Sequence, residues 1–255
     1  MKSLQISHVG HVLFGKPDAT MLKLKWDMGG GIIVSGQNQD SDYLGDNRTG
    51  EYSRSNNNSD DGVMIDALVG LGPQFSHLQR RLSWSILFGL SYHGQNLTMT
   101  DGYQTIDLIS NDFGPFHGLD STYEAKWWGA WIGTDVKMSP WARVNLSLHY
   151  EFHLVEYEAE ANWNLRSYLA HPVSFEHWGT GDFGLTDGYG MVGGIVAEIK
   201  LYDAWYLSLE GNYKTFQMKN GVDRVYFSDG TIADTRLNEV NWDSWCAMVG
   251  ISYQF

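Results

Sequence analysis

Apolar and polar residues alternate along several long segments of the chain, with a period of two residues. In ARVNLSLHYEFHL, residues 142–154, every even position is apolar and every odd position is polar or charged. The same alternation recurs in WYLSLEGNY (205–213) and in AMVGISYQF (247–255). A period of two predicts extended strands whose two faces meet different surroundings.

Long strands of this kind fit a transmembrane β-barrel, in which one face meets lipid and the other lines a wet lumen. A soluble β-sandwich also alternates, but its strands are usually shorter. We therefore predict an all-β, antiparallel, multi-pass barrel of the bacterial outer membrane. The charged residues on the second face are expected to fill the lumen: Arg143, His149, Glu151, His153, Glu210 and Lys214.

Nine strands are expected from the alternation, and their connections are short and long in turn. The strands fall near 6–14, 21–36, 61–72, 82–98, 124–137, 142–160, 186–200, 204–217 and 241–255, and the long polar segments near 37–60, 99–122, 161–185 and 218–239. Bacterial barrels have short periplasmic turns and longer extracellular loops. The four long segments are therefore expected at the extracellular end.

An odd number of strands is unusual, because single-chain bacterial barrels have an even number. The first residues, MKSLQISHVGHVLFGKPD, also lack the unbroken apolar stretch of a secretory signal. We expect a single domain over residues 1–255 that is N-terminally incomplete, with the first strand of the barrel missing.

Composition removes some classes of function. Thirty acidic residues against seventeen basic ones give a net charge of -13, which argues against nucleic acid as a partner. No segment has the roughly 18 consecutive apolar residues of a membrane-spanning helix. We expect no cofactor and no metal, with lipopolysaccharide as a candidate bound lipid.

One acidic pair falls in the first long loop, where Asp40 and Asp42 precede the aromatic Tyr43 in QNQDSDYLGD. Aspartates in a loop rich in Asn, Gly and Ser commonly end strands and solvate turns. A calcium site would need more oxygen ligands and the closing glutamate of a twelve-residue loop. On these residues alone the pair is either a loop feature or a catalytic acid pair.

The order of four segments resembles the omptin-type outer-membrane barrels and, within that superfamily, the Protochlamydia-type outer-membrane proteins. The segments are GQNQDSDYLGD, STYEAKWWGAWIGTDVKMSPW, LHYEFHLVEYEAEANW and CAMVGISYQF. The resemblance covers the chain from about residue 6 onward. It implies a ten-stranded barrel, of which this sequence lacks the first strand.

The resemblance also gives the acidic pair a role. In the proteolytic omptins an Asp-x-Asp-aromatic segment faces an Asp-x-His pair, and a water held between them attacks the peptide bond. Asp40 and Asp42 match the first half, whereas Glu160 and Asn162 occupy the positions of the second, and asparagine cannot act as a base near neutral pH. The next loop contains His171 and His177, one of which a displaced register could place over the mouth of the barrel, and His177 is the candidate replacement base.

Lys126 falls where omptins carry an arginine that contacts lipopolysaccharide phosphate, so the resemblance implies a lipid-binding role for it.

Three functions follow for the whole chain, in this order. The first is a non-proteolytic barrel whose extracellular loops bind a surface partner or have a structural role. The second is an aspartate-dependent endopeptidase that uses Asp40 and Asp42, and the third is a narrow channel. Acidic loops favour cationic peptides as partners of the first two.

Overall fold

The computed structural model describes residues 2–15, 20–77, 81–179 and 188–254, and these form one antiparallel β-sheet. Its strands are β1 (Lys2–Phe14), β2 (Met21–Ser35), β3 (Gln37–Gly45), β4 (Thr49–His77), β5 (Leu82–Asp107), β6 (Gly114–Phe116), β7 (Ser121–Trp141), β8 (Val144–Asn162), β9 (Phe175–Gly179), β10 (Gly188–Tyr202), β11 (Trp205–Tyr226) and β12 (Ile232–Tyr253). Within the described ranges, no helix is long and apolar enough to cross a membrane.

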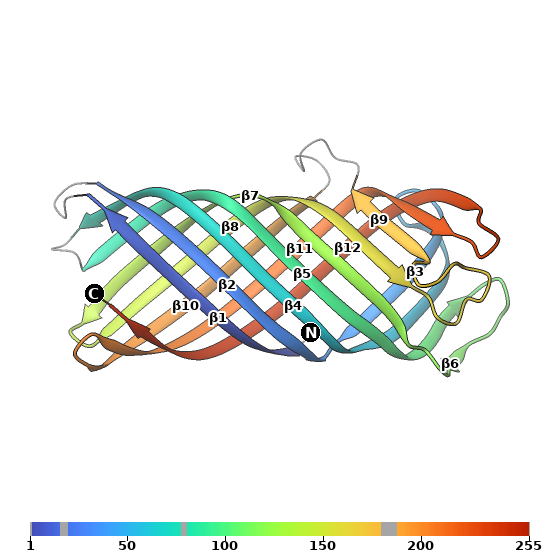
Figure 1. Ribbon diagram of the computed structural model, residues 1–255, viewed down its shortest axis with the longest axis horizontal. Helices are drawn as coiled ribbons and strands as arrows, with labels where there is room; N and C mark the ends of the chain where they lie inside the picture. Colours follow the sequence, from blue (N-terminus) through green and yellow to red (C-terminus); the bar gives the residue numbers. More distant parts are fainter. Residues whose placement is uncertain (1, 16–19, 78–80, 180–187, 255) are drawn as a thin grey trace.

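Nine of these strands follow one another around the barrel, in the order β1-β2-β4-β5-β7-β8-β10-β11-β12 (Figure 1). The nine strands expected from the alternation are therefore confirmed in the described part of the chain. The path ends at β1 and β12, which are neighbours without a ladder between them in the described ranges: the hydroxyl of Ser7 lies 3.4 Å from Sδ of Met248.

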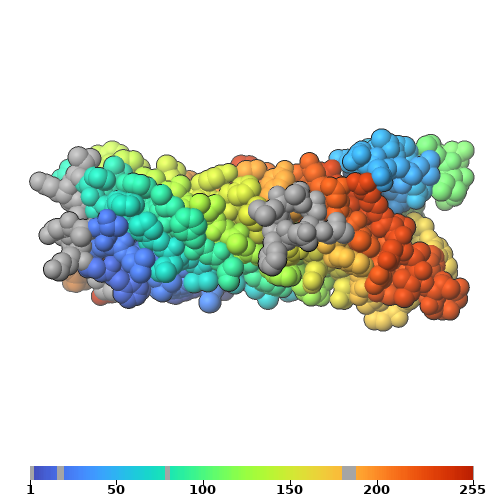
Figure 2. All heavy atoms as spheres, turned by 90° about the horizontal axis from the view of Figure 1, so that it is seen from above, coloured from blue at the N-terminus to red at the C-terminus, as the bar shows by residue number. Residues whose placement is uncertain are grey.

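The long polar segments contain more strand than the sequence analysis predicted. β4 and β5 continue well beyond the expected segments 61–72 and 82–98. At the same end of the barrel, β3 pairs with β4, β6 pairs with β5, and β9 pairs with β8 and β11 (Figure 1). We call this the loop end; the light-blue β3–β4 hairpin and the green β5–β6 connection project there (Figure 2). Residues 180–187, which belong to the long segment expected at 161–185, lie outside the described residues.

The polarity of the outward face inverts along the long strands. In the first part of β8, far from the loop end, the exposed residues are apolar, such as Leu148, while Glu151 is buried. In the last part of β8, toward the loop end, Glu160 is exposed while Val155 and Ala159 are buried. Even-numbered side chains of β8 point outward along its whole length. The change of polarity therefore reflects a change in what surrounds the barrel, and not a change in the direction of the side chains. The apolar outer belt meets lipid, and the polar outer face above it meets water.

The outer belt contains the large apolar side chains that the alternation places outside. Ile6 is 86% exposed and Val249 is 75% exposed, with Trp141 and Trp205 beside short turns. Above the belt the inside becomes an ordinary apolar core, built around Trp127, Tyr157 and Phe216 among others. The barrel thus continues beyond the lipid as a water-surrounded β-structure, and this upper part contains the acidic pair.

Candidate active site

The acidic pair lies on β3, on the face that points into the barrel. Asp40 is opposite Ser55 in the β3–β4 hairpin. Asn38, two residues before Asp40, donates a hydrogen bond to Sδ of the buried Met99 over 3.1 Å. Because side chains alternate along a strand, Asn38, Asp40 and Asp42 all face the interior at the loop end.

Asp40 is half-buried, and its environment disfavours the ionised carboxyl. Burial is the larger cause and the like charge of Asp42 the second, and together they raise the pKa of Asp40 to about 6. His177 and Arg166 act in the opposite direction and lower it. Burial also raises the pKa of Asp42, against a hydrogen bond from Ser53. Two neighbouring carboxyls with raised pKa values are typical of functional sites.

Asp40→Asn is expected to stabilise the folded protein near pH 7.5, by on the order of 1–2 kcal/mol once solvent screening of this partly exposed group is included. The folded-state pKa of about 6 lies above the ordinary value of 3.8, so the folded state binds the proton more tightly. The stability from this carboxyl is present below about pH 4 and is lost as the pH rises through 6.

Urea unfolding of the wild type and Asp40→Asn, at pH 5 and pH 7.5, measures this difference. The variant should gain stability relative to the wild type as the pH rises. Asp120→Asn, in an exposed loop at the same end, is the matched control and should show no such gain. A difference between Asp40→Asn and the wild type that is the same at both pH values would contradict the prediction.

His177 lies on β9, between Ala159 of β8 and Asp223 of β11. Its Nε2 is 3.1 Å from Oδ1 of Asp223, and its Nδ1 is 3.0 Å from the hydroxyl of Tyr123. That hydroxyl also makes a short hydrogen bond to the hydroxyl of Tyr157. A carboxylate beside Nε2 favours a proton on that nitrogen and leaves Nδ1 as the basic one.

Asp40 and Asp42 lie at the loop end of the barrel, and so does the pair of His177 and Asp223. We call the opening of the barrel at this end the mouth. Charges on both His177 and Asp223 act on the carboxyl of Asp40. The structure therefore places His177 at the same end of the barrel as Asp40, and the role of His177 as a replacement base stays a prediction. The structure adds Asp223, which the sequence analysis missed because the strand predicted at 204–217 ends before it.

A cleft of about 270 Å³ opens beside Asp40 at the loop end. Its wall is partly polar and partly apolar, with Ser55, Met99, Trp163 and Arg166 among its residues. Arg166 is exposed and its positive charge acts on both carboxyls of the acid pair. The cleft is large enough for a side chain of a bound peptide next to Asp40.

The structure does not bring Glu160 and Asn162 to this mouth. The residues that flank Glu160, Ala159 and Ala161, are buried, so Glu160 and Asn162 point outward. The amide oxygen of Asn162 is 2.6 Å from Nδ1 of His171, also outside the interior. The expectation that this pair occupies the place opposite Asp40 is corrected by the alternation of β8.

Lys126 lies on the outer face of β7, just above the apolar belt. Its ammonium is 2.9 Å from Oε1 of Glu124. In the register of the sheet, Glu158 and Glu160 of β8 lie opposite Lys126 and Glu124. Lys126 thus lies within an acidic part of the outer surface, and a role in binding lipopolysaccharide stays a prediction.

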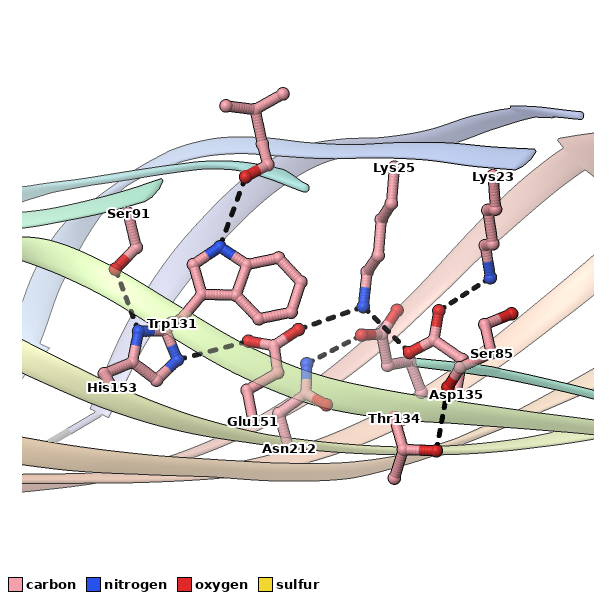
Figure 3. Close-up of polar contacts among 12 residues, drawn as sticks. Lys23, Lys25, Ser85, Ser91, Trp131, Thr134, Asp135, Glu151, His153 and Asn212 are labelled. Carbon is pink, nitrogen blue, oxygen red and sulfur yellow. Dashed lines mark hydrogen bonds and ion pairs between the residues drawn. The ribbon is translucent and has the colours of Figure 1, made fainter. Parts of the chain in front are cut away.

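The lumen beneath the mouth is filled first by an ion network (Figure 3). Nζ of Lys25 is 3.1 Å from Oδ1 of Asp135 and 2.9 Å from Oε1 of Glu151. Oε2 of Glu151 is 3.3 Å from Nε2 of His153, whose Nδ1 is 2.8 Å from the hydroxyl of Ser91. The predicted lumen-filling roles of Glu151 and His153 are confirmed, whereas Arg143 lies exposed beside a turn.

Aromatic rings pack above and around this network. The rings of Trp127, Phe216 and His93 are in contact, with centroids 4.7 Å apart between His93 and Phe216. The indole of Trp131 donates to the carbonyl oxygen of Val69 across 3.2 Å. A Cβ on Gly70 would lie 2.3 Å from this indole, so the glycine allows the ring to lie against the strand.

The described residues contain no group of three or more His, Cys, Asp or Glu side chains that could hold a metal ion. The side chains at the loop end include two carboxyls, an imidazole paired with a carboxylate, and the hydroxyl of Tyr123.

Comparison with known proteins identifies the relatives of this chain. The model of a family described as Protochlamydia outer membrane protein matches residues 2–255. No curated protein matches significantly. Among solved structures, the outer membrane protease OmpT from Escherichia coli is similar, with a TM-score of 0.68 and 11% identity over 98% of this chain and 87% of that one. These findings confirm the resemblance, the antiparallel barrel and the outer-membrane location.

Proposed function

The chain belongs to the Protochlamydia outer membrane protein family, and from that premise we propose that it is an outer-membrane endopeptidase with its active site at the extracellular mouth. The observation that carries the proposal is the contact of His177 Nε2 with Oδ1 of Asp223, 3.1 Å apart at the same end of the barrel as Asp40, whose pKa is raised by burial and by Asp42. The similar solved structure is that of an outer membrane protease. This ordering puts the endopeptidase ahead of the non-proteolytic function that the sequence favoured.

In the proposed reaction a water lies between Asp40 and His177. Nδ1 of His177 takes a proton from this water as its oxygen attacks the peptide carbonyl carbon, and Asp223 stabilises the resulting imidazolium. The carboxyls of Asp40 and Asp42 orient the water. The imidazolium then gives its proton to the amine nitrogen as the C–N bond breaks. The hydroxyl of Tyr123 must leave Nδ1 when the water enters.

The proposed substrates are cationic peptides. The chain carries a net charge of -13, and a protein field of one sign raises the local concentration of ligands of the opposite sign. Because this attraction acts between exposed charges, it should weaken as the salt concentration rises.

The proposal is tested by cleavage of a mixed library of basic and acidic peptides. Protein refolded with lipopolysaccharide is compared with an Asp40→Ala, Asp42→Ala double variant. An Asp120→Ala, Asp229→Ala variant, which removes the same charge from exposed loops, is the control. Cleavage by the wild type and the control but not by the first variant is expected. No cleavage by a folded wild type would overturn the proposal.

A second candidate is a barrel that binds peptides or other surface partners without cleaving them. One observation favours it: Nδ1 of His177, the nitrogen needed as a base, already lies 3.0 Å from the hydroxyl of Tyr123. If the hydroxyl does not leave, the mouth binds but has no free base. The same library experiment separates the two functions, because binding without cleavage supports the second.

The third function, a narrow channel, is disfavoured by the ion network and aromatic rings in the lumen. We expect the protein to give no steady stepwise conductance in planar lipid bilayers. Trp131→Gly, which removes an indole that fills the lumen, is the variant that should first produce leak currents. Steady conductance by the wild type would show that the side chains leave a continuous water path.

A further inference from the structure

A small cavity lies inside the barrel among side chains that the proposed reaction does not use. Its volume is about 10 Å³, and its wall includes His93 and Gln95 of β5, Trp127 of β7 and Trp242 of β12. Since β5 and β7 are not neighbours of β12 in the strand order, the cavity lies between opposite sides of the barrel.

Four polar atoms in this wall have no hydrogen-bond partner in the described part of the chain. They are Nε2 of His93, Oε1 of Gln95, and the Nε1 atoms of Trp127 and Trp242, and all four are inaccessible to solvent. Buried polar atoms without a partner are rare in native proteins, because they have lost their hydrogen bonds to water. Four such atoms around one cavity indicate a shared ligand.

We infer that this cavity binds a single water molecule. A water accepts two hydrogen bonds and donates two, and the wall offers two indole N–H donors, the amide oxygen of Gln95 and the ring nitrogen of His93. A cavity of about 10–15 Å³ holds one water, and buried waters commonly have two to four polar partners. Size and hydrogen-bonding pattern therefore agree.

The protonation of His93 supports water over an anion. Nδ1 of His93 is 2.5 Å from Oδ1 of Asp66, whose Oδ2 is 2.9 Å from Nζ of Lys214. The carboxylate fixes the proton on Nδ1, so that Nε2 of the neutral ring is an acceptor. An anion would instead need a second proton on His93 and the amide nitrogen of Gln95 turned inward. It would also be repelled by the carboxylate of Asp66, which is part of the cavity wall.

The inferred water joins strands from opposite sides of the lumen. It links β5 and β7 to β12, which in the described ranges has a ladder with β11 alone. The water therefore fills the space between these side chains and connects β12, the last strand, to the core. This role is independent of the proposed peptidase activity.

The test is nuclear magnetic resonance of the refolded protein with ¹⁵N-labelled tryptophan and histidine. We expect rotating-frame cross-relaxation between water and the indole protons of Trp127 and Trp242, and an unprotonated Nε2 on His93. Trp242→Phe should remove its own signal and reduce the transfer at Trp127 at least twofold. Trp245→Phe, at an exposed outward position, is the control and should leave both transfers unchanged.

Two results would overturn the inference. One is the absence of water transfer to both indole protons in the folded wild type. The other is a protonated Nε2 on His93, which would point to an anion. Both are measured on the wild type and do not depend on whether Trp242→Phe folds.

Discussion

His177→Asn is expected to lower kcat/KM for peptide hydrolysis by about 10²–10⁴-fold, the range typical of a lost general base. The side-chain amide of asparagine occupies about the same space as the part of the imidazole nearest the backbone, but it accepts no proton near neutral pH. The imidazole is the group in the proposed reaction that takes the proton from water, with Asp223 at 3.1 Å from its Nε2. The loss should therefore fall on kcat, with KM changed little.

The matched control is His171→Asn, which changes the same residue type in the same connection between β8 and β10. His171 is exposed, and its Nδ1 contacts Asn162 on the outer face. Its replacement should leave kcat/KM within about twofold of the wild type. Steady-state kinetics on a peptide selected from the library measures both. Full activity in His177→Asn would show that another group accepts the proton.

A smaller loss in Asp223→Asn would support the same arrangement. The amide still accepts a hydrogen bond but does not stabilise an imidazolium. kcat/KM should therefore fall, by less than in His177→Asn, because the imidazolium formed in the reaction loses its carboxylate partner. A kcat/KM equal to that of the wild type would leave Asp223 without an electrostatic role in the reaction.

The membrane-spanning strands could be predicted because lipid and lumen impose opposite polarities on their two faces. In residues 142–154 this contrast is nearly complete, and β8 begins at Val144, close to the predicted start. Above the lipid, both faces of a strand can be polar, so the alternation fades while the backbone ladder continues. The β3–β4 hairpin, with its run of Asn, Ser and Asp residues, therefore has the composition of a wet loop although it is a strand pair.

The site could be predicted only in part, for the same reason. Asp40 and Asp42 are a short motif on one strand, and a motif of this kind can be matched directly. His177 and Asp223 lie on different strands, 46 residues apart in sequence, and only the pairing of β9 with β11 brings them together. Glu160 and Asn162 were misplaced because the apolar face of β8 changes sides after Leu154, while the outward direction stays on even positions.

Lys25→Met is expected to destabilise the folded barrel by about 3–5 kcal/mol, the range for removing one partner of a buried ion pair. Methionine preserves most of the volume, so the effect comes from charge. Lys25 is 8% exposed and its ammonium contacts carboxylates of both Asp135 and Glu151. Asp135 retains Lys23 at 2.7 Å, so the larger part of the loss should arise at Glu151, which is left with His153.

Urea unfolding of protein folded in lipid vesicles, followed by tryptophan fluorescence, measures the loss. Lys126→Met is the matched control, because it removes the same charge from an outward, partly exposed pair with Glu124, and exposed pairs contribute about 0–1 kcal/mol. A similar effect of the two substitutions would mean that water in the lumen screens Lys25 as bulk water screens Lys126.

A Lys25→Met, Glu151→Gln double variant distinguishes lost attraction from an uncompensated charge. If the loss in Lys25→Met comes mainly from the unpaired carboxylate of Glu151, removing that charge should restore about half of it, and the two substitutions should be strongly non-additive. Additive losses would mean that Lys25 acts mainly through Asp135. Either pattern identifies which carboxylate, that of Glu151 or that of Asp135, depends most on Lys25.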